Sequence, residues 1–332
     1  MSNIREVAKL AGVSVATVSR AIRNPEKVSQ ASIDKVTKAI EEVDYRPNMP
    51  MRNYLSNKTQ SFIVLVPNIS NPFFSILIKS IELRAQERGY SVLLGDTQEQ
   101  AEREQNYIKI VENNLADGII QLRPHTGHDP FQESADFPYI NVCGCENTAG
   151  RSIRIDDVCA MKAVVKYLSS MGHKRIGLIG GDAANPHCID RSRGYHQALS
   201  DANIDVDETI IVSGDYSIWS GVNAADTLFE LDELPTAVVC MNDEMAIGAI
   251  QSFKSKGLRI PEDISITGFD NIDYAKYCSP PLSTISQPAN DMGRIAVDSL
   301  IDLIEGKTLE TDERILPYEF ILRESTAPPS LP

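Results

Sequence analysis

Apolar residues in the first part of the chain recur every three or four positions, which is the spacing of one face of an α-helix. The first such stripe is Ile4, Val7, Ala8 and Ala11. Asn3 can cap this helix together with Glu6, and Gly12 can end it because glycine adopts the left-handed conformation at no steric cost. The pattern therefore predicts a short helix that ends in a tight turn.

Two further short helices are predicted directly after this turn. Ser14 can cap the second helix, which covers residues 15–22 and is stopped by Asn24-Pro25. Ser29 can cap the third helix. Its apolar stripe is Ile33, Val36, Ile40 and Val43. Two short helices joined by a tight turn, with a third that completes a small core, are typical of a helix-turn-helix.

From Phe62 onward, apolar strand-like runs alternate with segments of helical periodicity. The predicted strands include residues 62–66, 90–95, 118–122, 174–180, 236–241, 264–269 and 314–323, and the first helices cover residues 73–88 and 99–115. This alternation predicts parallel sheets with helices on both faces. The stretch is longer than one such unit, so we expect two α/β lobes with a ligand between them, at the carboxyl ends of the strands.

The predicted organisation has three parts. Residues 1–46 form an all-α helix-turn-helix headpiece, and residues 62–332 form a two-lobed α/β body with parallel sheets. Residues 47–61, rich in proline, asparagine, serine and basic residues, form a linker.

Charge is distributed unevenly between these parts. The chain of 332 residues has a net charge of −14. Residues 1–58 hold ten basic and six acidic residues, a balance of +4, whereas the remainder holds 22 basic and 40 acidic residues, a balance of −18. A basic module on an acidic body indicates that the module is attracted to DNA phosphates and that the body is repelled by them.

Composition excludes several classes of protein. Hydrophobic residues make up 42% and charged residues 23%, as in a soluble globular protein rather than a disordered one. We expect no transmembrane helix and no secretory signal, because no run of about 18 apolar residues and no apolar N-terminal segment is present. The six cysteines are expected to be reduced thiols in a cytoplasmic protein. They are Cys143, Cys145, Cys159, Cys188, Cys240 and Cys278.

The second helix carries the side chains that can read DNA. Val18 and Ile22 are expected to face the core, which leaves the opposite side exposed. On that side Val15 and Ala16 can contact a thymine methyl, and Arg20 can pair with a guanine edge. Phosphates can be held by Thr17, Ser19 and the helix N-terminus. The candidate DNA contacts of this helix are therefore Ser14, Val15, Ala16, Thr17, Ser19, Arg20 and Asn24. The spacing alone fits an amphipathic helical hairpin with no partner equally well.

Signals of catalysis or of a metal site are weak. The chain has no Walker A run, no H-E-x-x-H and no G-x-S-x-G motif, and residues 177–181 lack the G-x-G-x-x-G spacing. Cys143 and Cys145, with His125 and His128 upstream, do not have a usual zinc spacing. His173 is expected at the surface or at a helix end. We therefore predict neither an enzyme nor a bound metal or other cofactor.

Residues 4–20 closely resemble the DNA-binding signature of the LacI family of bacterial repressors. The matching segments are IREVAKLAGVSVATVSR at 4–20, NPEKVS at 24–29 and YRPN at 45–48. In this family the linker folds on operator DNA into a hinge helix, and a leucine from each chain of a dimer wedges a base step in the minor groove. The resemblance makes Leu55 the candidate wedge. Pro50, in the middle of the segment, and an extra residue between Tyr45 and Lys58 depart from the usual pattern.

The body resembles the same family, whose two lobes are similar to periplasmic binding proteins. The matching segments are NPFF at 71–74, GHKRIG at 172–177, RSRGY at 191–195, NDEMAIGA at 242–249 and GFDN at 268–271. Residues 257–288, together with the lengthened linker that contains Pro50, are most similar to members that respond to cytidine.

The resemblance implies a set of effector contacts, residue by residue. Arg191 and Asp270 match the pair that holds polar groups of the ligand, and Asn242 can add a neutral contact. Phe73, Phe74 and Tyr216 match aromatic positions that line the cleft. A guanidinium donates to adjacent hydroxyl oxygens and a carboxylate accepts from hydroxyl protons, so the pair suits a ribose. The aromatic rings suit a base that stacks.

The sequence thus predicts a DNA-binding transcriptional repressor controlled by a nucleoside, with cytidine as the expected effector. Its expected partners are operator DNA, a second copy of the chain and, by resemblance, the cyclic-AMP receptor protein. A sugar or a purine is the alternative effector. A solute-binding protein and an α/β enzyme acting on nucleosides or sugars are the alternatives from other classes.

Overall fold

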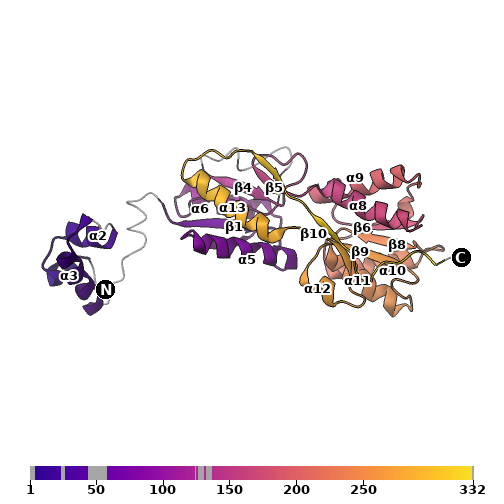
Figure 1. Ribbon diagram of the computed structural model, residues 1–332, viewed down its shortest axis with the longest axis horizontal. Coiled ribbons are helices and arrows are strands. Elements are labelled where there is room, and N and C mark those ends of the chain that lie inside the picture. Colours follow the sequence, from indigo (N-terminus) through magenta and orange to yellow (C-terminus); the bar gives the residue numbers. More distant parts are fainter. Residues whose placement is uncertain are drawn as a thin grey trace. The chain divides into compact units, whose positions relative to one another are not determined.

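The computed structural model describes residues 4–23, 27–43, 58–123, 125, 131 and 137–330, and it divides into two compact units, residues 1–59 and residues 60–332 (Figure 1). We call these units the head and the body. Most of the predicted linker, residues 47–61, lies outside the described residues, so its boundaries stay a prediction. Within the described part of the chain, no helix is long and apolar enough to cross a membrane.

The head consists of three helices around a small core. They are α1 (Ile4–Ala11), α2 (Val15–Arg23) and α3 (Gln30–Glu42). The buried residues of this core are Val7, Ala8, Ala11, Val18, Val36 and Ala39. They come from all three helices, as the predicted stripes require. The fold class predicted for the head is confirmed.

The body has two lobes of the same topology. The N-terminal lobe holds β1 (Ser61–Val66), α5 (Pro72–Glu87), β2 (Ser91–Asp96), α6 (Ala101–Glu112), β3 (Ile119–Gln121), β4 (Tyr139–Val142), β5 (Ser152–Arg154), α13 (Ala289–Ile304) and β11 (Glu313–Ile315). Its strand order is β11-β5-β4-β3-β1-β2, and all neighbouring strands are parallel. The register sets Ser61 beside Ser91 and Ile63 beside Ile119.

The C-terminal lobe repeats this arrangement with its own core. Its elements are α8 (Asp157–Ser170), β6 (Ile176–Gly180), α9 (Pro186–Asp201), η2 (Glu208–Ile210), β7 (Ile211–Ser213), α10 (Ile218–Phe229), β8 (Ala237–Cys240), α11 (Asp243–Ser255), β9 (Ser265–Asp270), α12 (Asp273–Tyr277), β10 (Ser283–Ser286) and β12 (Glu319–Ile321). The strand order is β12-β10-β9-β8-β6-β7, and its neighbouring strands are parallel except for β12, which is antiparallel to β10. Figure 1 shows α8 and α9 on one face of this sheet and α10 and α11 on the other.

Strand order determines where a ligand can bind. In each lobe the first strand of the series lies between the second and the third, so the chain continues first to one side of it and then to the other. The order therefore reverses between β1 and β3 in one lobe and between β6 and β8 in the other. Side chains that follow these strands border a crevice at their carboxyl ends.

One prediction from the sequence was wrong in detail, and a second was met in only one of its two alternatives. Residues 314–323 were predicted as one strand, but the structure has two, β11 and β12, which join different sheets. Pro317 lies between them and lacks the N–H that a continuous ladder needs. His173 follows the end of α8 as expected but is buried rather than at the surface. Its ring nitrogens contact the Thr236 hydroxyl and the Ala327 carbonyl, both at 2.9 Å.

Candidate functional site

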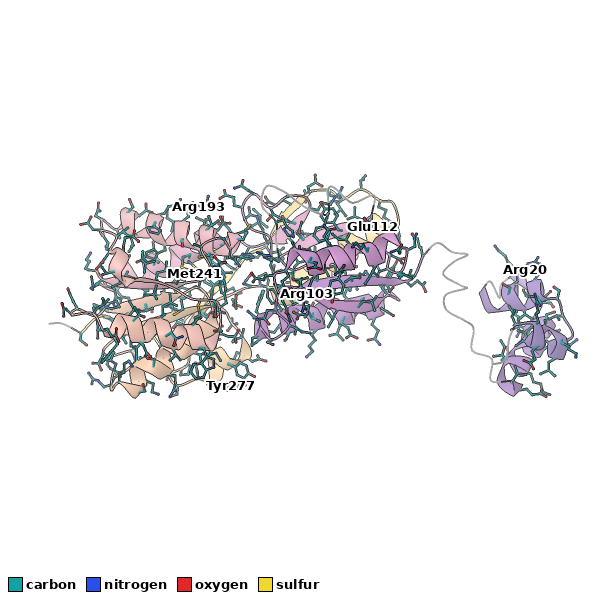
Figure 2. The ribbon with its side chains drawn as sticks, turned by 180° about the vertical axis from the view of Figure 1, so that it is seen from behind. Arg20, Arg103, Glu112, Arg193, Met241 and Tyr277 are labelled. Carbon is teal, nitrogen blue, oxygen red and sulfur yellow. The ribbon has the colours of Figure 1, made fainter. Side chains whose placement is uncertain are left out.

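The first candidate site is the exposed face of α2 in the head. Val18 points into the core and is fully buried, whereas Val15, Ala16 and Arg20 are exposed. Figure 2 shows Arg20 at the outer surface of the head. Thr17 and Ser19 are half-buried beside this face. The helix therefore offers two small apolar side chains and one guanidinium to a partner.

The turn before α2 fixes how this helix is presented. Gly12 has a φ of +65°, the left-handed region that glycine enters without strain. The Ser14 Oγ then accepts a hydrogen bond from the Thr17 N–H at 3.1 Å and lies 2.8 Å from the Thr17 hydroxyl. This cap leaves the N-terminus of α2 open to solvent, where unpaired N–H groups can meet a phosphate.

Three residues of the predicted interface and linker lie outside the described residues. They are Asn24, Pro50 and Leu55, and their predicted roles stay predictions. The same holds for the capping role of Asn3.

Arg20→Ala should weaken operator binding by about 1–3 kcal/mol and relax the preference at one base pair in each half-site, because a guanidinium that pairs with a base edge reads sequence. Binding to operator variants can be measured by fluorescence anisotropy. Lys38→Ala removes a positive charge from an exposed position of α3 and controls for charge alone. Equal losses on operator and random DNA would make Arg20 a phosphate contact.

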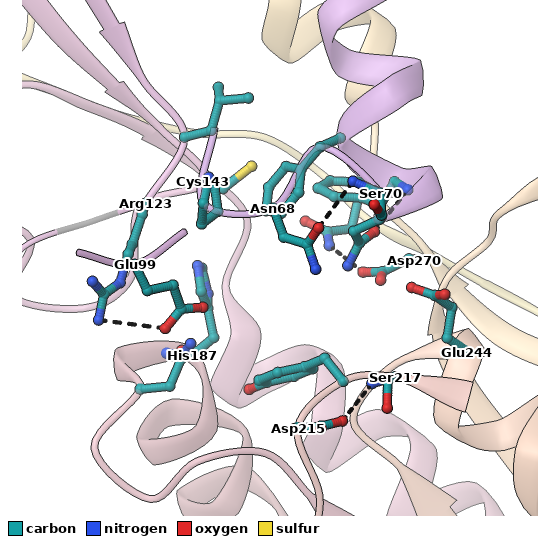
Figure 3. Close-up of a pocket in the computed structure, with 18 of the residues that line it drawn as sticks. Asn68, Ser70, Glu99, Arg123, Cys143, His187, Asp215, Ser217, Glu244 and Asp270 are labelled. Carbon is teal, nitrogen blue, oxygen red and sulfur yellow. Dashed lines mark hydrogen bonds and ion pairs between the residues drawn. The ribbon is translucent and has the colours of Figure 1, made fainter. Parts of the chain in front are cut away.

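The second candidate site is a cavity of about 230 Å³ in the body (Figure 3). Residues of both lobes line it, and they follow the carboxyl ends of the strands as the topology requires. Three helix N-caps take part. Asn71, Asn185 and Ser217 accept hydrogen bonds from the first turns of α5, α9 and α10 and line the cavity. The helices therefore present their N-termini and their first side chains to it.

Arg191 is a buried charge on the cavity wall. Its Nε donates to Asp157 Oδ1 at 2.7 Å, its Nη1 donates to the Met241 carbonyl at 2.5 Å, and its guanidinium stacks on the Phe269 ring at 3.7 Å. Burial by itself would raise the pKa of Asp157, but Arg191 and His187 lower it to about 2. Within the described structure Nη2 has no partner, so it is free to bind a ligand.

Asp270 lies at the end of β9 in a strained backbone conformation. Its φ is +111°, and that of Asn271 is +55°. Such values in residues other than glycine are costly and concentrate at functional sites. Gln287 donates to Asp270 Oδ1 at 2.7 Å, and no described residue donates to Oδ2. Burial raises the pKa of Asp270 to about 6, against the opposing effects of Arg191 and Gln287.

The aromatic residues expected at the ligand lie on both sides of the cavity. Phe73 is buried in the N-terminal lobe, Phe74 is half-buried beside it, and their ring centroids are 5.7 Å apart. Tyr216 faces them from the other lobe with a φ of +67°. Its ring passes over Gly181, where a Cβ would lie 2.3 Å from ring carbons. The buried Tyr216 hydroxyl has no hydrogen-bond partner among the described residues.

Asn242 is the predicted contact that the structure does not place on the cavity wall. Its side-chain oxygen accepts from the Met245 N–H at 2.9 Å and so caps α11, while its Nδ2 donates to the Tyr216 carbonyl at 2.8 Å. Both ends of the amide are thus used inside the protein. This geometry suits a residue that positions Tyr216.

Several cavity residues were missed by the sequence analysis. His187 contacts Asp157 Oδ2 through Nδ1 at 3.1 Å, so its Nε2 is left for the cavity. Glu244 is the second residue of α11 and lies within the matching segment at 242–249. Gln287 donates a hydrogen bond to Asp270. Asp157 had no signal in the sequence, because its role depends on an arginine 34 positions away.

The cysteines form no disulfide and no metal site in the described residues. All six are free, and Cys143, Cys145, Cys188 and Cys240 are buried. Burial raises the pKa of Cys145 to about 11, which keeps this thiol protonated at neutral pH. No group of histidine, cysteine or carboxylate side chains in the described part of the chain is arranged to hold a metal ion.

Sequence comparison connects both sites to known regulators. Residues 3–48 match the family described as bacterial regulatory proteins, lacI family, and residues 165–326 match the periplasmic binding protein-like domain. The HTH-type transcriptional repressor CytR of Escherichia coli (strain K12) is 40% identical over 328 residues, 98% of this chain and 96% of that protein. The repressor PurR of Vibrio atlanticus is 36% identical over 93% of this chain and 94% of its own length.

Comparison of structures gives the same result. The lac repressor dimer bound to operator and the anti-inducer ONPF has a TM-score of 0.91 at 26% identity, and the match covers 98% of this chain and 99% of that one. A LacI family regulator from Enterococcus faecium with bound ribose has a TM-score of 0.73 at 30% identity, over 81% of this chain and 99% of that one. These relatives are regulators of transcription and not enzymes.

Proposed function

Because the chain belongs to the LacI family of bacterial transcriptional repressors, we propose that a nucleoside, cytidine, binds in the cavity of the body and controls operator binding by the head. The family membership accounts for a DNA-reading helix in one unit and a ligand cavity in the other. The identity of the ligand is the proposal, and it depends on the side chains of the cavity.

One observation carries the proposal: Arg191 and Asp270 each keep a free hydrogen-bonding atom at the cavity. Arg191 offers an unpartnered Nη2 donor, and Asp270 offers an unpartnered Oδ2 acceptor, within the described structure. A donor and an acceptor together match the vicinal hydroxyls of a ribose. Phe74 and Tyr216 supply faces on which a base can stack.

The charge of the cavity favours a neutral ligand. Four carboxylates line it, against two guanidinium groups. The carboxylates are Glu99, Asp215, Glu244 and Asp270, and the guanidinium groups belong to Arg123 and Arg191. Both guanidinium groups already face a carboxylate, since Arg191 binds Asp157 and Arg123 lies 3.8 Å from Glu99. A phosphate would face excess negative charge in a partly desolvated site, so the nucleoside is favoured over the nucleotide.

We further propose that the repressor acts as a cytoplasmic homodimer on a palindromic operator, as the lac repressor dimer supports. Ligand bound between the lobes shifts the population of lobe arrangements and thereby changes how the two heads engage DNA. The similarity of residues 257–288 to cytidine-responsive members supports cooperation with the cyclic-AMP receptor protein on DNA.

Isothermal titration calorimetry with cytidine, 2′-deoxycytidine, free cytosine and cytidine monophosphate tests the ligand. Cytidine should bind tightest. Deoxycytidine should lose about 1–3 kcal/mol because a buried polar group of the site is left without its hydroxyl. Cytosine lacks the sugar that the clamp binds, and the monophosphate carries negative charge that the carboxylates of the cavity repel. Both should therefore bind poorly.

The same titration with a purine base and with a hexose tests the alternative effectors. A purine base or a hexose that binds as well as cytidine would overturn the nucleoside proposal in favour of another effector class. Binding of cytidine monophosphate as tight as that of cytidine would show that the carboxylates do not select against charge. In either case the assignment as a repressor stands, because it depends on residues of the head and on the relatives.

A further inference from the structure

Glu244 is a carboxylate of the cavity with no role in the ribose clamp. It occupies the second position of α11, after the N-cap Asn242, and is half-buried on the cavity wall. Figure 3 shows its carboxylate pointing into the cavity toward Asp270, on the same side as Ser217. It therefore lines the same cavity as Tyr216 and Ser217, from the N-terminus of a different helix.

The hydrogen bonds of the cavity single out this side chain. Asp215 accepts from the Ser217 N–H at 2.9 Å, Asp270 accepts from Gln287, and Glu99 lies 3.8 Å from Arg123. Glu244 is the cavity carboxylate for which the described residues supply neither a hydrogen bond nor an ion pair. Removing a carboxylate partly from water without a partner costs free energy, so a ligand that supplies a hydrogen bond to it is favoured.

The charged groups around Glu244 oppose its ionisation. Asp270 at the end of β9 and Asp215 before α10 both act on it, and burial adds to their effect. Together burial and these two carboxylates raise the pKa of Glu244 to about 7. The positive groups are engaged elsewhere, since Arg191 binds Asp157 and Arg123 lies beside Glu99. His187 contacts Asp157 as well.

We propose that Glu244 reads the hydrogen-bonding edge of the effector's base as a neutral carboxylic acid, so that effector binding takes up a proton. The inference rests on the proposed nucleoside ligand. A protonated carboxyl group has one O–H donor and one carbonyl acceptor. These match the N3 acceptor and the exocyclic amino donor on adjacent positions of cytosine. An ionised carboxylate can accept from the amino group but repels N3.

This arrangement predicts a specific dependence of affinity on pH. The bound state holds Glu244 protonated, so its pKa is higher in the complex than in the free protein. Affinity is therefore constant below the pKa of the free protein and falls as the pH rises through it, by up to about tenfold per pH unit. Asp270, with a pKa of about 6, adds a separate loss at acidic pH, because the clamp needs its carboxylate ionised. Measurements between about pH 7 and about pH 9 isolate the effect of Glu244.

The test is calorimetry with cytidine and the full-length protein in buffers of different ionisation enthalpy, on wild type and on Glu244→Gln. Wild type should take up about half a proton per cytidine near pH 7 and about 0.9 near pH 8. Glutamine keeps one donor and one acceptor but does not titrate. Glu244→Gln should therefore show no proton uptake and a flat pH profile, and near pH 9 it should bind cytidine more tightly than wild type.

A second ligand tests the same inference on the wild-type protein, without a substitution. In 3-deazacytidine a C–H group replaces N3, so the acid O–H has no acceptor, and the wild type should bind this analogue without proton uptake. Glu230→Gln, an exposed carboxylate at the end of α10, controls for a change of charge in the same lobe and should keep the wild-type profile.

Two results would overturn the inference. If wild type and Glu244→Gln bind cytidine with the same pH profile and the same proton uptake, another group takes the proton and Glu244 does not read the base, although the nucleoside proposal stands. If cytidine fails to bind wild type at every pH, the nucleoside proposal falls and this inference falls with it.

Discussion

Replacing Arg191 by methionine should abolish detectable cytidine binding and lower the thermal stability of the body, while DNA binding in the absence of effector survives. The residue is 5% exposed and supplies the free donor of the ribose clamp. Its loss also leaves Asp157, which is 2% exposed, without its guanidinium partner. Truncating one member of a buried ion pair costs about 3–5 kcal/mol of stability, because the other charge stays buried and uncompensated.

The stability defect should depend on pH in a defined direction. In the wild type Arg191 and His187 outweigh burial and hold the pKa of Asp157 near 2, so its contribution to stability is present at neutral pH and lost only as the pH falls toward that value. In Arg191→Met burial dominates and the pKa of Asp157 should rise above that of the unfolded chain. Protonation then relieves the penalty. The difference in melting temperature between variant and wild type should therefore shrink as the pH is lowered from 7 to about 4.

Arg193→Met is the matched control for this experiment. Arg193 lies on the same helix, and its side chain is 40% exposed. It pairs with Glu146 at the surface and with the buried Asp190, whose carboxylate keeps a second partner because it also accepts from the Glu146 N–H. Its removal should change stability by about 1 kcal/mol or less and leave cytidine affinity near that of the wild type. Equal losses from the two substitutions, measured by calorimetry and thermal melting, would contradict the assignment of Arg191 to the ligand.

Removing the head should eliminate DNA binding completely and leave effector binding intact. The fragment of residues 60–332 has the body's own hydrophobic cores and a charge of −18, so DNA phosphates repel it. The full-length protein should bind operator DNA with an affinity that falls steeply as salt is added. The reason is that the basic head, on binding, displaces the counterions that surround the DNA phosphates. Electrophoretic mobility shift assays at several salt concentrations, with cytidine calorimetry on the same fragment, measure both effects.

Cytidine binding by the same fragment is the control for the truncation. An unchanged heat of cytidine binding shows that the fragment is folded, so that loss of DNA binding can be attributed to the missing residues. Retention of operator affinity by the headless fragment would contradict the division into a DNA-reading head and an effector-binding body.

Local sequence signals were sufficient for the head. The Gly12 turn, the Ser14 cap and the stripe that buries Val18 are properties of residues close together in the chain, and the structure has each of them as predicted. The exposure of Arg20 follows from the same periodicity. Helix caps, turns and helix faces depend on spacing over a few residues, which is why a sequence determines them without knowledge of the rest of the fold.

The two-lobed body was also predictable as a class, because alternating strands and helices permit few topologies. Its boundaries were less certain. The last predicted strand proved to be β11 and β12, which add to opposite lobes. Periodicity identifies an extended segment but does not say which sheet edge it joins, since that depends on partners far away in the chain.

Only the tertiary structure decided the chemistry of the cavity. The sequence suggested Arg191 and Asp270 as ligand contacts, but it did not show that Asp157 fixes Arg191, that Gln287 occupies one oxygen of Asp270, or that Asn242 is used as a helix cap. It also missed Glu244, whose carboxylate is left without a partner in the described structure while its neighbours are engaged. Which polar atoms remain free to bind a ligand depends on burial and on hydrogen bonds between distant segments, and these exist only once the two sheets have brought their strand ends together.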